Sequence, residues 1–85
     1  MARSDWKKGE IPETFIGMSY KGQKNELIFH HKTKPTAIIV TNPLGLGSYN
    51  VVLLEKRGNF RRTLKRDFRS RQKALNYAKW YMRRH

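Results

Sequence analysis

Two strand-like segments, residues 49–57 and 60–68, are separated only by Gly58 and Asn59. Glycine and asparagine readily adopt the positive φ angles that a two-residue β-turn requires, so the sequence predicts a tight hairpin here. A two-residue turn also fixes which residues of the two strands lie opposite one another. On one face it predicts three opposed pairs: Arg57 with Phe60, Glu55 with Arg62, and Leu53 with Leu64.

The predicted hairpin has an apolar face and a basic face. Side chains alternate along a strand, so one face collects apolar residues that we expect to meet the core: Leu53, Phe60, Leu64 and Phe68. The opposite face pairs Lys56 with Arg61, Leu54 with Thr63, and Val52 with Lys65. Val52 and Leu54 need a cover, for which the candidates are the N-terminal arm, a folded-back strand, a partner subunit and the ligand.

The rest of the chain divides into a polar arm and a single domain. Residues 1–13 are polar and are predicted to form the arm, with Trp6 holding it in place. The domain, residues 14–85, is predicted to hold further strands at 14–20, 26–32 and 36–41, of which the last two form a hairpin. Residues 42–48 contain a proline and two glycines, which predicts a loop.

The C-terminal segment has the features of a capped amphipathic helix. Ser70 precedes residues 71–84, which contain neither glycine nor proline, and serine caps a helix by accepting a backbone hydrogen bond. One face of that helix is apolar: Ala74, Leu75, Ala78, Tyr81 and Met82. Trp80 falls on the polar side, where it either packs against the arm or Trp6, or serves as a stacking platform or interface anchor. The predicted fold class is α+β, an antiparallel sheet of three to five strands packed against one C-terminal helix.

Positive charge is concentrated at the C-terminal end of the chain. The formal net charge is +13, and residues 56–85 hold twelve of the nineteen Lys and Arg but only one of the six acidic residues, Asp67. Repulsion among so many like charges opposes folding, which points to a polyanionic partner. Nucleic acid is the partner we predict, with duplex DNA favoured over RNA.

The predicted contact residues lie on the basic face of the hairpin and at the helix start. A two-stranded ribbon fits the major groove of DNA, where basic side chains reach phosphates and arginine also reads guanine. A helix N-terminus attracts phosphate as well. The predicted nucleic-acid-binding residues are Lys56, Arg57, Arg61, Lys65, Arg69 and Arg71. Arg62 and Arg66 fall on the core face by parity and are expected to reach the ligand only from its rim.

No motif in the sequence indicates catalysis, a cofactor or a metal. His30 and His31 are adjacent, so on a strand they point to opposite faces and cannot chelate one metal together. The GLGS segment, residues 45–48, lacks the lysine of a phosphate-binding loop. Acidic residues are scattered, and the absence of cysteine excludes disulfides and thiolate chemistry. We therefore expect no enzyme activity, no cofactor and no small-molecule substrate.

The aliphatic runs are short. The longest, residues 37–40 and 51–54, fall far below the roughly 20 residues that cross a bilayer, and the N-terminus lacks the apolar segment of a signal peptide. We expect no membrane insertion and a cytoplasmic location, in the nucleoid if DNA is bound.

The segment that runs from Phe68 and Ser70 to Ala74 and Ala78 resembles the end of two DNA-binding families. These are the plant ethylene-response-factor type domain and the arm-binding domain of phage and transposon integrases, which share this strand end, helix cap and packing alanine. The resemblance implies a three-stranded antiparallel sheet in the major groove with a helix packed behind it. The tryptophan-rich strands of the plant family are missing, so its base-reading residues do not carry over.

Two further resemblances leave the ligand open between DNA and RNA. The helix is similar to the last helix of double-stranded-RNA-binding domains at Ser70, Arg71 and Ala74, and the chain resembles small archaeal chromatin proteins in size, charge and element order. Structured RNA, as in a ribosome-associated factor, is the alternative ligand. An alternative of another class is an interaction module that docks on an acidic protein, with three apolar anchors: Val52, Leu54 and Trp80. A homodimer also stays open.

Overall fold

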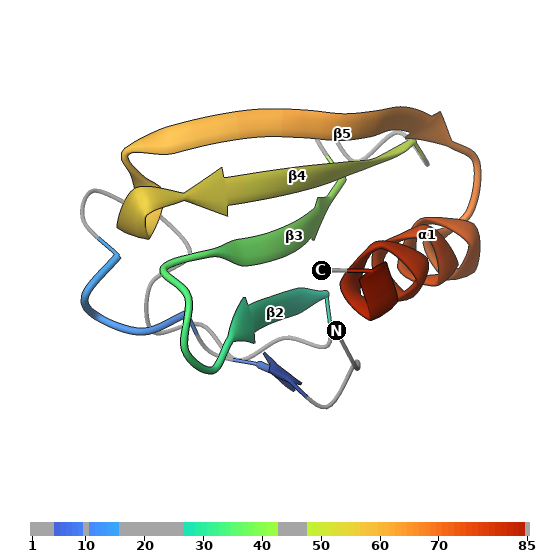
Figure 1. Ribbon diagram of the computed structural model, residues 1–85. Helices are drawn as coiled ribbons and strands as arrows, with labels where there is room; N and C mark the ends of the chain where they lie inside the picture. The colour runs from blue at the N-terminus through green and yellow to red at the C-terminus, as the bar shows by residue number, and fades with distance from the viewer. Residues whose placement is uncertain (1–4, 10, 16–26, 43–47, 85) are drawn as a thin grey trace.

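The computed structural model describes residues 5–9, 11–15, 27–42 and 48–84. Within them lie five strands: β1 (Trp6–Lys8), β2 (Ile28–His31), β3 (Ala37–Thr41), β4 (Tyr49–Glu55) and β5 (Phe60–Phe68). One helix, α1 (Arg71–Arg84), follows them. The strands form a single sheet in the order β1-β2-β3-β4-β5, and every neighbouring pair is antiparallel (Figure 1). The predicted α+β class, an antiparallel sheet packed against one C-terminal helix, is confirmed.

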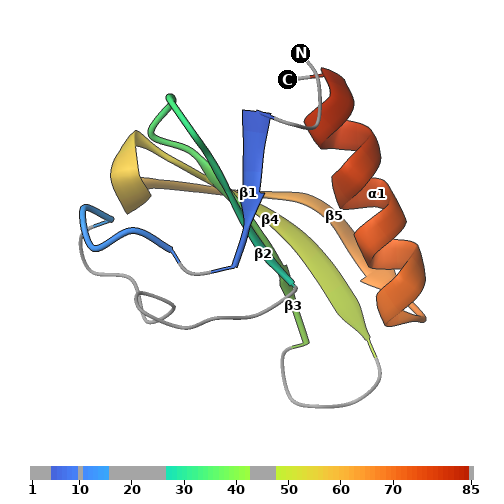
Figure 2. The same cartoon turned by 90° about the horizontal axis from the view of Figure 1, so that it is seen from below.

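The helix covers one face of the sheet (Figure 2). Between them lies the helix-side core, which consists of Trp6, Phe29, Ile38, Val40, Val51, Leu53, Ala74, Leu75, Ala78 and Met82. Four of the five helical residues predicted to be buried belong to it, and the fifth, Tyr81, packs against it half-buried. The two alanines have small side chains, so the helix backbone can lie close to the sheet.

The opposite face of the sheet is covered by residues 11–15 (Figure 2). The backbone N–H of Phe15 donates to the Pro12 carbonyl at 3.0 Å, which folds this segment into a turn. Ile11 and Phe15 are 0% and 3% exposed, and they pack against apolar residues of β2, β3 and β4. Val52 and Leu54 belong to this second core, so a segment of the same chain supplies the cover that the sequence left undecided.

The predicted N-terminal arm contains a strand. β1 pairs with β2, with Trp6 opposite His31, and the backbone N–H of Gly9 donates to the Ile28 carbonyl at 2.7 Å. Trp6 is buried in the helix-side core and holds this segment against the sheet, as predicted. The strand predicted at 14–20 is absent from its two described residues, because Thr14 lies in a turn and Phe15 in a bend. Residues 16–20 lie outside the described residues, as do 43–47 of the predicted loop.

The predicted hairpin between residues 26–32 and 36–41 is present. Its strands, β2 and β3, pair with Ile28 opposite Ile39 and Phe29 opposite Ile38. β-Branched and aromatic side chains are suited to a pleated surface that is buried on both sides. Along β3, alternate residues therefore enter the two cores: Ile38 and Val40 on the helix side, Ala37 and Ile39 on the other.

The turn between β4 and β5 differs from the prediction. Lys56–Gly58 form a 3₁₀ turn, and Glu55 rather than Arg57 lies opposite Phe60. Positive φ angles occur at Lys56 (54°), Arg57 (57°) and Gly58 (94°), whereas Asn59 has a φ of −75°. The backbone N–H of Arg57 donates to the Pro35 carbonyl in the β2–β3 turn, 3.1 Å away. This contact between two turns favours the longer loop, and the local sequence contains no sign of it.

β5 holds two more residues than the part of β4 that it pairs with. The register shifts twice along the ladder. Val52 lies opposite Thr63, Val51 lies opposite Lys65 after the first shift, and Tyr49 lies opposite Phe68 after the second. Each shift adds one residue to β5, which is the signature of a β-bulge. At the second shift Asp67 has a φ of 64°, and its backbone N–H donates to Asn50 Oδ1 at 3.1 Å. The bulges change which side chains of β5 share a face.

The start of α1 is capped as predicted. The Ser70 hydroxyl oxygen accepts a hydrogen bond from the backbone N–H of Lys73 at 3.1 Å, and the Ser70 carbonyl accepts one from Ala74 at 3.2 Å. The cap satisfies a donor that the first turn of a helix cannot pair within itself. It also fixes where the chain leaves β5 and enters the helix.

Candidate nucleic-acid interface

β5 is the edge strand of the sheet, at the edge opposite β1 (Figure 1). Basic side chains are exposed along it and beside it: Lys56, Arg57, Arg61, Arg62, Lys65, Arg66 and Arg69. Charges on an edge strand prevent other chains from pairing with it, so part of this pattern has a structural explanation. The distribution of the charges over the two faces of β5 determines which of them could contact a ligand together.

The predicted set of Lys56, Arg61 and Lys65 does not share one face. Lys56 lies in the turn, and Arg61 lies opposite Leu54, on the side of the second core. Lys65 lies opposite Val51, on the helix side. The first bulge causes the change, because it inserts a residue between Thr63 and Lys65 and so reverses the parity that the sequence implied.

The same bulge corrects the prediction for Arg66. Arg62 lies opposite Leu53 and is on the helix side, as predicted, but Glu55 does not lie opposite it. Arg66 follows Lys65, so strand alternation places it on the side of Arg61, away from the helix. Each side of β5 therefore carries two exposed cations: Arg61 and Arg66 on the side away from the helix, and Arg62 and Lys65 on the helix side.

The sequence predicted that Phe60 would meet the core, but in the structure it does not. It lies opposite Glu55 at the end of the β4–β5 ladder and is 47% exposed. Leu64 and Phe68, farther along the same strand, do pack against the helix-side core. The helix follows the other end of β5, and of the three apolar residues only Leu64 and Phe68 pack against the core that it covers.

Arg69 and Arg71 flank the cap of α1. Arg69 is exposed and Arg71 is half-buried, and both lie within one residue of Ser70. The Ser70 hydroxyl already occupies the backbone N–H of Lys73, which removes one donor from the helix start. The arginine side chains and the helix dipole remain as attractions for an anion at this point.

Aromatic side chains connect the end of β5 to the helix. The ring centroids of Phe68 and Tyr77 are 5.5 Å apart, and those of Tyr77 and Trp80 are 5.6 Å apart. The guanidinium carbon of Arg84 lies 4.7 Å from the centroid of the Trp80 ring. We call these four residues the aromatic ladder. Trp80 is 42% exposed, so the ladder that begins at Phe68 of β5 ends in an open aromatic surface on the helix.

Trp80 does not pack against Trp6, so that interpretation was wrong. Its ring neighbours are Tyr77 and Arg84, and Trp6 instead meets the His31 ring in the sheet. The ladder was not predicted from the sequence, although side chains three and four residues apart lie together on a helix surface. A function for Trp80 in stacking or docking stays a prediction.

Two of the three anchors proposed for a protein-docking module are not available. Val52 and Leu54 are 2% and 1% exposed beneath residues 11–15, so neither can contact a partner in this fold. Trp80 is the one that remains exposed. The docking hypothesis therefore loses most of the apolar surface on which it was based.

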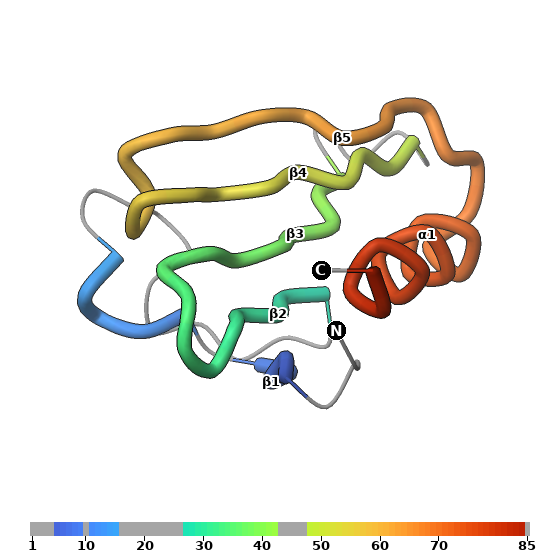
Figure 3. Tube along the Cα trace, viewed as in Figure 1, coloured from blue at the N-terminus to red at the C-terminus, as the bar shows by residue number. Residues whose placement is uncertain are grey.

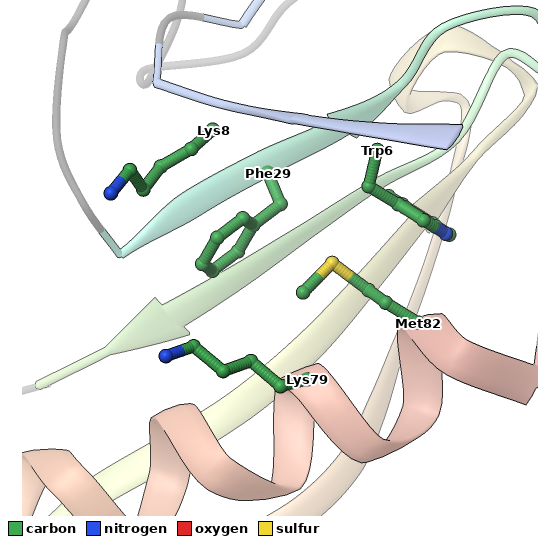
Figure 4. A pocket seen from close by; sticks show the side chains of 5 residues that line it. All are labelled: Trp6, Lys8, Phe29, Lys79 and Met82. Carbon is green, nitrogen blue, oxygen red and sulfur yellow. The ribbon is translucent and has the colours of Figure 1, made fainter. Parts of the chain in front are cut away.

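A small hollow lies between α1 and the edge of the sheet formed by β1 and β2. It encloses about 170 Å³ and is lined by Trp6, Lys8, Phe29, Lys79 and Met82. Figure 4 shows the side chains of Lys8 and Lys79 extending toward the same side of the hollow, with Phe29 between them. Because β1 and β5 are the two opposite edges of the sheet, this hollow does not belong to the interface on β5.

Other kinds of site find little support in the described residues. Among them, no three His, Asp or Glu side chains gather as a metal ion would require. Within the same residues, no helix combines the length and the apolar composition of a bilayer span. Comparison of the chain with protein-family models, curated proteins and solved structures finds no match.

Proposed function

We propose that the protein binds nucleic acid without catalysing a reaction on it, and that its ligand is duplex DNA. The observation that carries this proposal is the exposed edge strand β5, with Arg61 and Arg66 on one side and Arg62 and Lys65 on the other. A strand that enters a groove edge-on brings the cations of its two sides to the phosphates of the two DNA strands. This arrangement replaces the single basic face expected from the sequence.

Protection of the sheet edge alone does not account for the charge pattern. Edge protection needs only a few charges, and they can have either sign. From Lys56 to Arg69 seven basic residues are exposed, against Asp67 as the one acid in that range. A surface of one sign raises the local concentration of an oppositely charged polymer, which supports a polyanionic ligand.

The helix start and the aromatic ladder extend the proposed surface. Arg69 and Arg71 continue the basic strand to the N-terminus of α1, where the helix dipole favours phosphate. The exposed Trp80 ring lies at the far end of the ladder from Phe68. Stacking on an aromatic ring is open to unpaired bases of any sequence, so the test includes single strands.

Chemical-shift mapping with duplex DNA, duplex RNA and single-stranded DNA at two salt concentrations tests the proposal. We expect saturable changes at backbone amides of β5 and of the helix start, tightest binding to duplex DNA, and weaker binding at the higher salt concentration. Tighter binding to duplex RNA would make structured RNA the ligand. Absence of saturable binding to all three polymers would refute nucleic-acid binding.

Two double variants that remove equal charge test the edge-on orientation. Arg61→Gln with Arg66→Gln neutralises the side away from the helix, and Arg62→Gln with Lys65→Gln neutralises the helix side. The control, Lys7→Gln with Lys8→Gln, removes the same charge from exposed residues of β1. We expect both β5 variants to weaken binding and the control to retain it. If only the first variant weakens binding, one face rather than the edge contacts the ligand.

A further inference from the structure

Three segments that are distant in sequence meet at one end of the sheet. Figure 3 shows the β2–β3 turn, the β4–β5 turn and residues 11–15 at this end, and the hydrogen bond from the Arg57 N–H to the Pro35 carbonyl joins the two turns at 3.1 Å. A hollow of about 230 Å³ lies among them. Its lining includes Lys32, Lys34 and Arg57 as cations and Thr14 as a hydroxyl donor, while the Thr33 hydroxyl lies 3.3 Å from His31 Nδ1. We call it the tip hollow.

The charged side chains that line the tip hollow are of one sign, and Asp5, which acts on His31, is outside the lining. Of the residues that the structure describes, no Asp or Glu lines it, although Lys32, Lys34 and Arg57 do. Bringing three cations together costs electrostatic free energy unless an anion is present. A solvated surface would separate these side chains, whereas here the contact between the two turns holds their backbones together.

The backbone of the β4–β5 turn is strained to reach this arrangement. Lys56 and Arg57 have φ angles of 54° and 57°, in the left-handed region that is sterically unfavourable for L-residues. Asparagine or glycine would occupy these positions at lower cost. Strain of this kind persists where the surrounding structure enforces it, and it is concentrated at functional sites.

The opposite wall of the tip hollow is also held in one shape. The Nδ1 atom of His31 accepts hydrogen bonds from the backbone N–H groups of Thr33 and Lys34, both at 3.1 Å. His31 itself is buried in the sheet. The turn that carries Lys32 and Lys34 is therefore held by the buried His31 side chain. It is preorganised, so a ligand does not have to order it on binding.

We propose that the tip hollow binds a phosphoryl group. A phosphoryl group offers the negative charge that three cations lack, the Arg57 guanidinium can donate two parallel hydrogen bonds to it, and the Thr14 hydroxyl can donate as well. The phosphoryl group can belong to the backbone of a nucleic acid or to a small phosphorylated molecule. Arg57 belongs to both surfaces, but the proposal does not depend on binding at β5, because the β5 double variants leave every residue of the tip hollow unchanged.

The test is a titration of the full chain with sodium phosphate against sodium chloride at equal ionic strength, followed by amide chemical shifts. We expect saturable changes at Thr33, Lys34 and Arg57 with phosphate only. In Lys34→Gln with Arg57→Asn the affinity for phosphate should fall at least about tenfold, because two charged donors are lost. The control, Lys73→Gln with Arg83→Gln, removes equal charge from exposed residues of the helix and should bind phosphate as the native chain does.

The outcomes separate the proposal from its alternatives. Changes that spread over all basic surfaces, or that persist in the tip variant, would overturn a phosphoryl site. If a nucleoside monophosphate saturates the tip hollow and an oligonucleotide without terminal phosphate does not, the ligand is a phosphomonoester. If that oligonucleotide suffices, the ligand is a backbone phosphate. Because the β5 double variants keep the tip hollow, phosphate binding in them distinguishes failure of this site from failure of the nucleic-acid interface.

Discussion

The indole ring of Trp6 and the imidazole ring of His31 meet edge to face, with their centroids 5.0 Å apart, where β1 pairs with β2. The Nδ1 atom of His31 accepts hydrogen bonds from two backbone N–H groups in the following turn. A nitrogen that accepts these bonds cannot carry a proton, so the hydrogen bonds assign a neutral ring with its proton on Nε2. One buried histidine thus links the N-terminal strand, the sheet and the β2–β3 turn.

We predict that the protein loses stability as the pH falls below 6.5, the ordinary pKa of histidine. Burial, and then the charge of Lys34, lower the pKa of His31 in the folded state, while Asp5 opposes them. The unfolded chain therefore binds the proton at a higher pH than the folded protein does. The free energy of unfolding should decrease from pH 6.5 down to the folded-state pKa, which urea unfolding at a series of pH values measures.

His31→Gln is the matched variant for this prediction. Glutamine does not titrate and supplies a carbonyl that can accept a backbone hydrogen bond, while His30 is retained. The variant should be less stable than the native chain at neutral pH and should show a weaker pH dependence. An unchanged dependence would assign the effect to other groups.

Loss of the helix cap should destabilise the fold by about 1 kcal/mol. Ser70→Ala removes the hydroxyl that accepts the Lys73 N–H at 3.1 Å, and it leaves a backbone donor unpaired. Ser70→Asn keeps a side-chain acceptor at the same position and should stay close to the native stability. Chemical denaturation of the three chains compares them, and equal stability of Ser70→Ala and the native chain would contradict a stabilising cap.

Relief of strain in the β4–β5 turn should instead stabilise the fold. Arg57→Asn places a residue that tolerates the left-handed region at a φ of 57°, and we expect the free energy of unfolding to rise by about 1 kcal/mol. Gly58→Ala, at a φ of 94°, should lower it by a similar amount. Thermal unfolding reports both changes, and a destabilised Arg57→Asn variant would show that the arginine side chain supports the turn.

Alanine substitutions at Trp80 and Met82 should have different effects on nucleic-acid binding and on stability. Trp80 is 42% exposed, whereas Met82 is 1% exposed in the helix-side core. Met82→Ala should therefore cost about 2–5 kcal/mol of stability, and Trp80→Ala should cost much less. If the aromatic ladder contacts nucleic acid, Trp80→Ala should weaken binding to single strands more than binding to duplexes. Equal loss for both polymers would argue against base stacking.

The sequence predicts well those features that depend on neighbouring residues. The cap at Ser70, the buried face of α1 and the hairpin of β2 and β3 all follow from local spacing, and all are present. The close packing of Ala74 and Ala78 follows from the same helical period. The fold class could be inferred from these elements alone.

Features that depend on distant contacts could not be predicted in this way. The β4–β5 turn is shaped by Pro35, which lies more than twenty residues before it, and the bulge at Asp67 is held by the Asn50 side chain. A single inserted residue then moves Lys65 and Arg66 to opposite sides of β5 from those expected. The exposed basic side chains thus lie on the segment that the sequence predicted, but their predicted distribution over its two faces was wrong.

The salt dependence of DNA binding tests the central claim most directly. With about six phosphate contacts, the logarithm of the association constant should fall with a slope near −5 against the logarithm of salt concentration. Fluorescence anisotropy of a labelled duplex measures this slope for the native chain, for Arg61→Gln with Arg66→Gln, and for Lys7→Gln with Lys8→Gln. The account predicts that the β5 variant has a slope shallower by about 2 and that the β1 control keeps the native slope. Equal slopes for all three chains, or binding that does not change with salt, would contradict it.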